Sequence, residues 1–204
     1  MARPRTVSDE LIHEATAEVI RRHGLKGTTL AAVAAEAGLS AAGLVQRFGS
    51  KRQLLLEFAR RAEAATGACF TGSRAATTSP LQALHAALAA LTAQVRERSD
   101  LANNLSFLQL DVSDEEFRVL AAANAHRVQA QVEELLREAV DAGELLADTD
   151  ARALARTVHL TYNGVLTLWP LTGTQPLARE LHTAVDAALR PHLSTLRDLG
   201  SEHP

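Results

Sequence analysis

Polar and basic side chains gather in one short stretch of the sequence, residues 28–51, "TTLAAVAAEAGLSAAGLVQRFGSK". Gln46 carries an amide that can form two hydrogen bonds with adenine, and Arg47 carries a guanidinium that fits guanine or a phosphate. Free backbone N–H groups at the start of a helix attract phosphate. Four residues with a hydroxyl or ammonium group lie at expected helix starts: Thr28, Thr29, Ser40 and Lys51. These residue types in this order suit contact with a nucleic-acid duplex.

Two short helices joined by a tight turn would position these side chains. The apolar spacing predicts helices over 28–37 and 40–48, packed against a first helix over 8–23. Gly38 can adopt the positive φ of a sharp turn, and Ser40 can cap the helix that follows. The pattern predicts a helix-turn-helix over residues 29–48. The alternative is a helical hairpin of an ordinary bundle.

The second of these helices begins with three residues that have almost no side chain. Ala41, Ala42 and Gly43 would let its backbone approach the floor of the major groove closely. The residues expected at the DNA are therefore Thr28, Thr29, Ser40, Ala41, Ala42, Gly43, Gln46, Arg47 and Lys51.

The remaining sequence predicts further helices and no strand, so the fold class is all-α. After a helix over 50–66, residues 71–79 suggest a loop, and four apolar patterns suggest helices over 79–99, 101–110, 113–143 and 148–169. Pro170 should end the last of these, and a final helix over 176–199 should bend at Pro191. We expect an N-terminal three-helix DNA-binding domain over 6–66 and a larger helical domain over 67–204.

Charge and composition narrow the classes of function. Residues 1–60 hold nine Lys/Arg against six acidic residues, a net charge of +3, although the chain as a whole carries −3. A basic N-terminal part on an acidic body suggests a polyanionic partner. No apolar window is long enough for a membrane span and no secretory signal is evident, while a single cysteine, Cys69, allows no intrachain disulfide. We therefore expect a cytoplasmic protein without membrane contact.

Catalytic and metal-binding patterns are missing from the sequence. The eight histidines show no HExxH spacing and there is no CxxC pair, so we expect no metal site and no cofactor. Cys69 and His85 could act as nucleophile and base, but the sequence offers no third group to orient them. We expect no enzyme. The alternative function is a helical small-molecule carrier or enzyme without DNA binding.

The N-terminal stretch "HGLKGTTLAAVAAEAGLSAAGLVQRFGSKRQLL" resembles the tetracycline-repressor (TetR) family of bacterial transcriptional regulators, and the likeness covers about residues 6–66. The later stretch "DAGELLADTDARALARTVHLTYNGVLTLW" resembles the passage between that family's long central helix and its first dimerisation helix. The resemblance implies a homodimer that binds a palindromic double-stranded DNA operator. It also implies a pocket in the C-terminal domain that binds a small-molecule effector, and this binding releases the DNA.

Two residues depart from the family pattern in the second helix of the motif. The family usually has tyrosine, which contacts a phosphate, where this chain has Val45, and commonly has threonine where it has Gly43. Two polar contacts are lost, so Gln46, Arg47 and Lys51 should carry more of the interaction with DNA.

The candidates for the effector pocket are large or polar side chains after residue 100. These are Asn104, Leu105, Leu108, Phe117, His126, Tyr162 and Trp169. The scarcity of aromatic residues favours a modest apolar ligand with one or two polar anchors. The alternative for each apolar member is an ordinary core position.

Two helices near the C-terminus each show an apolar face, and such faces from two chains could form a four-helix interface. One face contains Leu154, Val158, Thr161, Val165 and Leu168, and the other contains Leu177, Leu181, Val185 and Leu189. The alternative is that both faces pack within their own chain.

Overall fold

The structure is a computed structural model that describes residues 7–194, apart from the side chains at positions 63 and 102–104. This part of the chain is helical and contains no strand, as the sequence predicts, with one isolated β-bridge between Leu145 and Leu193. The helices are α1 (Asp9–Gly27), α2 (Leu30–Glu36), α3 (Ala41–Phe48), α4 (Lys51–Ala76), α5 (Pro80–Ala90), α6 (Arg98–Ser113), α7 (Glu115–Asp141), α8 (Ala151–Thr172), α9 (Leu177–Leu189) and the short 3-10 helix η1 (Arg190–His192). Within these residues, no helix has the length and apolar character that crossing a membrane requires.

The chain divides into two compact units, and α4 and α7 contribute to both. Unit 1 comprises the chain up to Thr66 together with Gln94–Ala125, and unit 2 comprises Gly67–Ala93 and the chain from His126 onward. The sequence suggested a domain boundary between residues 66 and 67, and that boundary stays a prediction. The inclusion of Gln94–Ala125 in the same unit was not part of that prediction.

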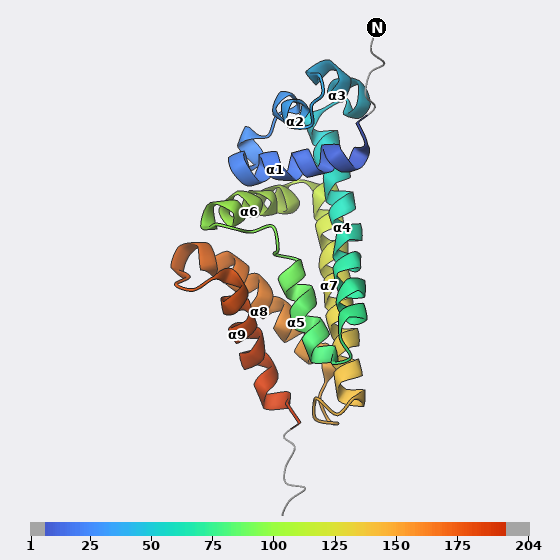
Figure 1. Cartoon of the computed structure of the whole chain (residues 1–204), viewed down its shortest axis with the longest axis vertical. Coiled ribbons are helices and arrows are strands. Elements are labelled where there is room, and N and C mark those ends of the chain that lie inside the picture. Colours follow the sequence, from blue (N-terminus) through green and yellow to red (C-terminus); the bar gives the residue numbers. More distant parts are fainter. Residues whose placement is uncertain (1–6, 195–204) are drawn as a thin grey trace, which may run out of the picture. The chain divides into compact units, whose positions relative to one another are not determined.

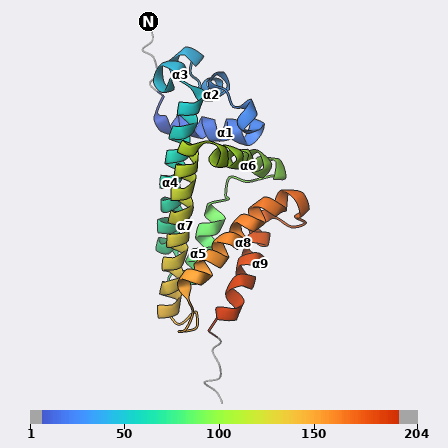
Figure 2. The ribbon, with the colours of Figure 1, turned by 180° about the vertical axis from the view of Figure 1, so that it is seen from behind.

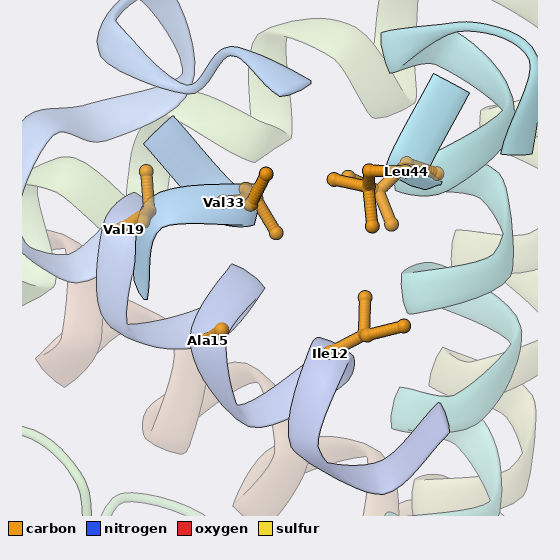
Figure 3. Packing of buried hydrophobic residues seen from close by; sticks show 7 residues of the cluster. Ile12, Ala15, Val19, Val33 and Leu44 are labelled. Carbon is orange, nitrogen blue, oxygen red and sulfur yellow. The ribbon is translucent and has the colours of Figure 1, made fainter. Parts of the chain in front are cut away.

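The first three helices of unit 1 pack around a small aliphatic core (Figure 3). Ile12, Ala15 and Val19 recur on one face of α1 at helical spacing, and they meet Val33 of α2 and Leu44 of α3. Each of the larger side chains contributes about 1.5–3 kcal/mol by leaving water. This burial fixes the face of α3 that points inward, and thereby the face that remains outside.

A second cluster in unit 1 joins α1 and α4 to the α6–α7 segment. Phe117 of α7 is buried against Ile20, Leu55 and Leu56, and Phe107 of α6 packs on the ring of Phe58. Polar contacts also join α6 to α1, which lie beside each other in Figures 1 and 2. The Arg21 guanidinium lies 2.6 Å from the carboxylate of Asp100, and the backbone N–H of Leu25 donates to the Ser106 hydroxyl at 3.0 Å.

In unit 2, α8 and α9 pack along each other, as Figures 1 and 2 show. Apolar residues of both helices are buried within the chain. They are Leu154 and Val158 of α8 and Leu177, Leu181, Val185 and Leu189 of α9. These residues were predicted to form an interface between two chains, and the structure corrects that assignment. Of the other residues of the predicted α8 face, Thr161 and Val165 are half-buried and Leu168 is exposed, as are Leu160 and Leu171 of the same helix.

Several helix boundaries differ from the sequence predictions. The predicted loop over 71–79 is wrong in its first part, because α4 continues to Ala76, and α5 ends at Ala90 rather than near 99. Pro170 does not end α8, which continues to Thr172 although this proline has no N–H to donate within the helix. The final helix ends at Leu189 and is followed by η1, while positions 195–199 of its predicted range lie outside the described residues.

Candidate nucleic-acid interface

The turn between α2 and α3 is built from local hydrogen bonds that the sequence predicts. Gly38 adopts a φ of 68°, and the backbone N–H of Leu39 then donates to the carbonyl of Ala34 at 2.8 Å. Thr29 caps α2 through the N–H of Ala32, and Ser40 caps α3 through the N–H of Gly43. The predicted helix-turn-helix is therefore confirmed as a fold element.

The outer face of α3 has small side chains at its start and polar ones near its end. Ala41, Ala42, Gln46 and Arg47 are exposed, whereas Leu44 is fully buried and anchors the helix to the core. Val45, which stands where the family usually has tyrosine, is 46% exposed. A helix with this surface can lie close to another molecule along its first turn.

Gly43 allows the cap of α3 to close tightly. A Cβ atom at this position would lie 3.2 Å from the Ser40 hydroxyl oxygen, the atom that accepts the N–H of Gly43 itself. The sequence suggested that this glycine lets the backbone approach the duplex and that it lacks the threonine contact common in the family. The structure adds a compensating contact, because the absent side chain leaves room for the capping serine.

Arg47 is held by the start of α1. One guanidinium nitrogen donates to the carbonyl of Val7 at 2.7 Å, and another lies 2.5 Å from the carboxylate of Asp9. The sequence does not predict this partner, because a pairing between distant residues has no local signal. Arg47 can reach DNA from its position on α3 if these exposed contacts are exchanged for a phosphate or a base.

Lys51 has a partner of its own at the start of α4. Its ammonium donates to the carbonyl of Leu25 at 2.6 Å, just after the break in α1 at Gly24, where φ is 63°. The ammonium has three donors, so this bond leaves others available to a phosphate. Lys51 therefore joins α4 to the end of α1 and retains a charge beside the motif.

The phosphate contact predicted for Thr28 is wrong, because the structure buries this residue. Its side chain has no exposed surface, and its hydroxyl donates to the carbonyl of Gly24 at 2.8 Å. A hydroxyl in this position satisfies the backbone at the end of α1 and offers no surface to a phosphate. Thr29, which caps α2, is exposed.

Several of the arginines that make the N-terminal part basic serve the fold of unit 1. Arg52 binds the carboxylate of Asp114 with two nitrogens and pairs with Glu116, and these contacts hold the pKa of Asp114 below its ordinary value. Arg21 meets Glu18 and the buried Asp100. Burial alone would raise the pKa of Asp100, but N–H donors from the backbone of Arg96 and from Arg21 lower it overall. The positive charge expected from composition is thus partly neutralised.

The residues predicted for the effector pocket fall into both units. In unit 1, Phe117 is 1% exposed and belongs to the core, Leu108 is 54% exposed, and Leu105 is half-buried. The side chain of Asn104 lies outside the described part of the structure. Phe117 therefore has a core environment, Leu105 an intermediate one and Leu108 a surface one, so these three residues do not share one setting.

The three predicted effector residues of unit 2 have distinct surroundings. Tyr162 is buried between neighbouring helices, and burial together with the nearby Cys69 thiol raises the pKa of its phenol. Trp169 is nearly buried, and its indole N–H donates to the carbonyl of Gln175 at 2.8 Å. His126 lines an open, polar groove of about 320 Å³ that also includes Glu133, Arg137 and Arg152.

Comparison with known protein families agrees with this architecture. The model for bacterial regulatory proteins of the tetR family matches residues 12–58, which include the whole helix-turn-helix. The model for the tetracyclin repressor-like C-terminal domain matches residues 106–185. No curated protein matches the chain.

Solved structures of the same fold cover nearly the whole chain. A TetR transcription regulator from Haloarcula marismortui is 23% identical, with a TM-score of 0.74 and coverage of 90% of this chain and 97% of its own. SmeT, the repressor of the Stenotrophomonas maltophilia multidrug efflux pump SmeDEF, is 22% identical, with a TM-score of 0.64 and coverage of 98% and 96%. Thermus thermophilus FadR, a transcriptional repressor solved with lauroyl-CoA, is 21% identical, with a TM-score of 0.60 and coverage of 96% and 99%. These solved structures share the fold, and the two family matches, with the capped helix-turn-helix, identify the chain as a member of the TetR family of DNA-binding transcriptional regulators.

Proposed function

We propose that the protein is a homodimeric repressor that binds a palindromic operator through α2 and α3 and releases it when a small apolar effector binds. The observation that carries the proposal is the outer face of α3, where Ala41 and Ala42 precede the exposed Gln46. An α-helix that enters the major groove reads base edges with a few side chains, and a glutamine amide pairs with adenine. A protein with this function works in the cytoplasm, where prokaryotic chromosomes lie.

Contacts to the DNA backbone would come from the residues around the recognition helix. Thr29 and Ser40 lie at helix N-termini, where unpaired N–H groups favour a phosphate. Lys51 adds a positive charge at the start of α4. These groups set the register on the duplex, while Gln46 and Arg47 supply sequence discrimination.

Two recognition helices are needed, because one reads only a few base pairs. In dimers of this kind the half-sites lie about one helical turn apart, roughly 34 Å, which a symmetric pair of subunits provides. The exposed leucines of α8, Leu160, Leu168 and Leu171, offer an apolar surface for a second copy of the chain. Leu168 belongs to the face suggested by the sequence, whereas Leu160 and Leu171 do not.

The dimer can be tested by changing one of these exposed leucines. Leu168→Glu should convert the dimer to monomers in sedimentation experiments at micromolar concentration and weaken operator binding with it. Leu108→Glu, at a similarly exposed leucine on α6, is the matched control and should leave the assembly unchanged. A wild-type protein that sediments as a monomer and binds its operator fully would contradict the dimer.

The effector is proposed to be a modest apolar molecule bound in the larger helical domain. Tyr162, Trp169 and His126 remain the candidates within unit 2, whereas Phe117 belongs to the core of unit 1 and Leu108 lies on the surface of that unit. Support comes from FadR of Thermus thermophilus, which was solved with lauroyl-CoA. A switch of this kind requires the ligand to favour the released state by a few kcal/mol.

The contacts between α1 and α6 provide a route for release within unit 1. Asp100 and Ser106 of α6 hold the side chain of Arg21 and the backbone of Leu25 on α1. A displacement of α6 would therefore move α1 and, through the shared core, the recognition helix. We propose that effector binding acts through this connection and through α4.

A salt-dependent gel shift on the DNA upstream of the protein's own gene tests the proposed function. A repressor should bind one palindrome there, lose affinity steeply with rising salt, and lower transcription from that promoter in a reconstituted reaction. A helical carrier or enzyme would bind no duplex. Activation of transcription, or equal binding to many weak sites, would contradict the repressor assignment.

A further inference from the structure

Two histidines and one aspartate meet on the surface of unit 2, from helices that are far apart in the sequence. His85 lies on α5, and His182 and Asp186 lie one turn apart on α9. His85 Nε2 is 2.9 Å from one carboxylate oxygen of Asp186, and His182 Nδ1 is 3.0 Å from the other. The ligand atoms of the three residues all lie within 4.8 Å of one another.

Their chemistry and spacing match the donors of a divalent transition-metal ion. Imidazole nitrogen and carboxylate oxygen are the donors that Zn²⁺ accepts at about 2.0–2.2 Å. Neighbouring donors around a tetrahedral Zn²⁺ are then roughly 3.3 Å apart. The two N···O distances in the cluster, 2.9 and 3.0 Å, are close to this separation.

We propose that His85, His182 and Asp186 form a binding site for a divalent first-row transition-metal ion, with Zn²⁺ as the best match. Three protein ligands leave at least one position for water. The ion would join α5 to α9 within unit 2. No metal site was expected from the sequence, because short motifs cannot reveal ligands that come from distant helices.

Binding requires one change in side-chain geometry. The two imidazole rings are stacked, with centroids 4.2 Å apart and planes 15° apart. A ligated metal lies in the plane of each ring, so two nearly parallel rings cannot both face the same ion. The side chain of His182 is 60% exposed, whereas that of His85 is only 20% exposed. His182 therefore has the freedom to turn while His85 and Asp186 keep their places.

Titration of untagged, chelator-treated full-length protein with Zn²⁺ in a calorimeter tests the site. We expect saturation at one ion per chain and a higher melting temperature for the loaded protein. Each of three substitutions should weaken Zn²⁺ binding by at least about tenfold: His85→Gln, His182→Gln and Asp186→Asn. About a tenfold loss of metal affinity is the smallest that is typical even for residues that only support the ligands. His192→Gln, at a histidine on η1 of the same unit, is the matched control and should leave the affinity unchanged.

A second measurement separates coordination from other effects of substitution. Co²⁺ bound by the wild-type protein should show the visible absorption bands of a low-coordinate nitrogen–oxygen site, and His182→Gln should lose them. His182 is exposed, so this variant should fold normally. Absence of saturable Zn²⁺ binding, or equal binding by the wild type and the three variants, would overturn the site and leave a hydrogen-bonded His–Asp–His cluster. DNA binding by the metal-free protein has no bearing on this result, so the proposed function is tested separately.

Discussion

Gln46 and Arg47 are neighbours on the outer face of α3, but their surroundings differ. Gln46 presents its amide at an exposed position, while Arg47 is bound to Val7 and Asp9 at the start of α1. An exposed ion pair contributes at most about 1 kcal/mol to stability. Arg47 can therefore leave Asp9 at small cost when a phosphate or guanine becomes available.

Replacing Arg47 separates its role in DNA binding from its role in folding. Arg47→Ala should weaken operator binding by about 1–3 kcal/mol, measured by fluorescence anisotropy. Its free energy of unfolding in urea should fall by no more than about 1 kcal/mol. Asp9→Asn serves as the comparison, since it releases Arg47 without removing it and should not weaken binding. Unchanged affinity in Arg47→Ala would assign this residue to the fold alone.

Thr28 provides the opposite case, a motif residue that the structure places in the interior. Thr28→Val keeps the shape of the side chain and removes the hydrogen bond to the carbonyl of Gly24. The free energy of unfolding should fall by about 0.5–1.5 kcal/mol, because one buried hydrogen bond is lost while the backbone N–H of residue 28 still donates to the same carbonyl. Operator affinity of the folded variant should equal that of the wild type. A variant with the stability of the wild type but weaker DNA binding would show that Thr28 does contact a phosphate.

At the scale of helices, α1, α3 and α4 meet at a histidine in an apolar setting. His13 is 8% exposed, lies between the rings of Phe48 and Phe58, and neither ring nitrogen has a hydrogen-bond partner among the described residues. Burial lowers the pKa of His13 below its ordinary value of 6.5, and Arg61 adds to the effect. Three nearby carboxylates oppose it, from Glu57, Asp9 and Glu10.

The lowered pKa of His13 gives the stability of the protein a definite dependence on pH. The unfolded chain, with the ordinary pKa, binds a proton before the folded chain does as the pH falls. The contribution of neutral His13 is therefore constant above about pH 6.5 and is lost as the pH falls from there through the folded pKa. Urea unfolding at pH 7.5 and 5.5 should show a smaller decrease for His13→Leu than for the wild type. Equal decreases in the two proteins would contradict this account.

The end of α8 depends on a close contact between a glycine and the single tryptophan. A Cβ atom at Gly173 would lie 2.3 Å from Cδ1 of Trp169, whose indole N–H is bonded to Gln175. Gly173→Ala should displace the indole, shift its fluorescence to longer wavelength, and lower the free energy of unfolding by about 1–3 kcal/mol. Gly72→Ala in α4 is the matched control, because no atom lies within 4 Å of its Cβ position. This control should raise stability by up to about 1 kcal/mol. A stable Gly173→Ala with unchanged emission would refute the contact.

The features that the sequence predicts correctly at this scale are the local ones. The caps at Thr29, Ser40 and Ser79 and the turn at Gly38 each depend on residues three to five positions apart, so their signals lie within one short stretch. The helix boundary near 94–98 was not predictable in this way. Asp100 accepts the N–H groups of Arg96 and Glu97 while it binds Arg21, and that arginine lies on a different helix.

At the scale of the whole chain, the all-α fold and the helix-turn-helix follow from periodicity, but the grouping of helices does not. The buried faces of α8 and α9 have the same apolar pattern whether they meet each other or a second chain, and only the structure shows that Val158 and Val185 lie in the chain's own core. The same limit applies to the candidate site. The pairing of Arg47 with Asp9 and the cluster at His85 depend on contacts between distant helices.

The central claim, that α3 reads base pairs, is tested most directly by selecting duplexes from a random pool with the full-length protein and measuring their affinity. The selected duplexes should contain an inverted repeat with half-sites about one helical turn apart. The logarithm of the association constant should fall linearly with the logarithm of the salt concentration. Gln46→Ala should lose about 1–3 kcal/mol of discrimination at one base pair in each half-site, while its binding to unrelated duplexes stays the same. No enriched sequence, or full discrimination in Gln46→Ala, would contradict the account.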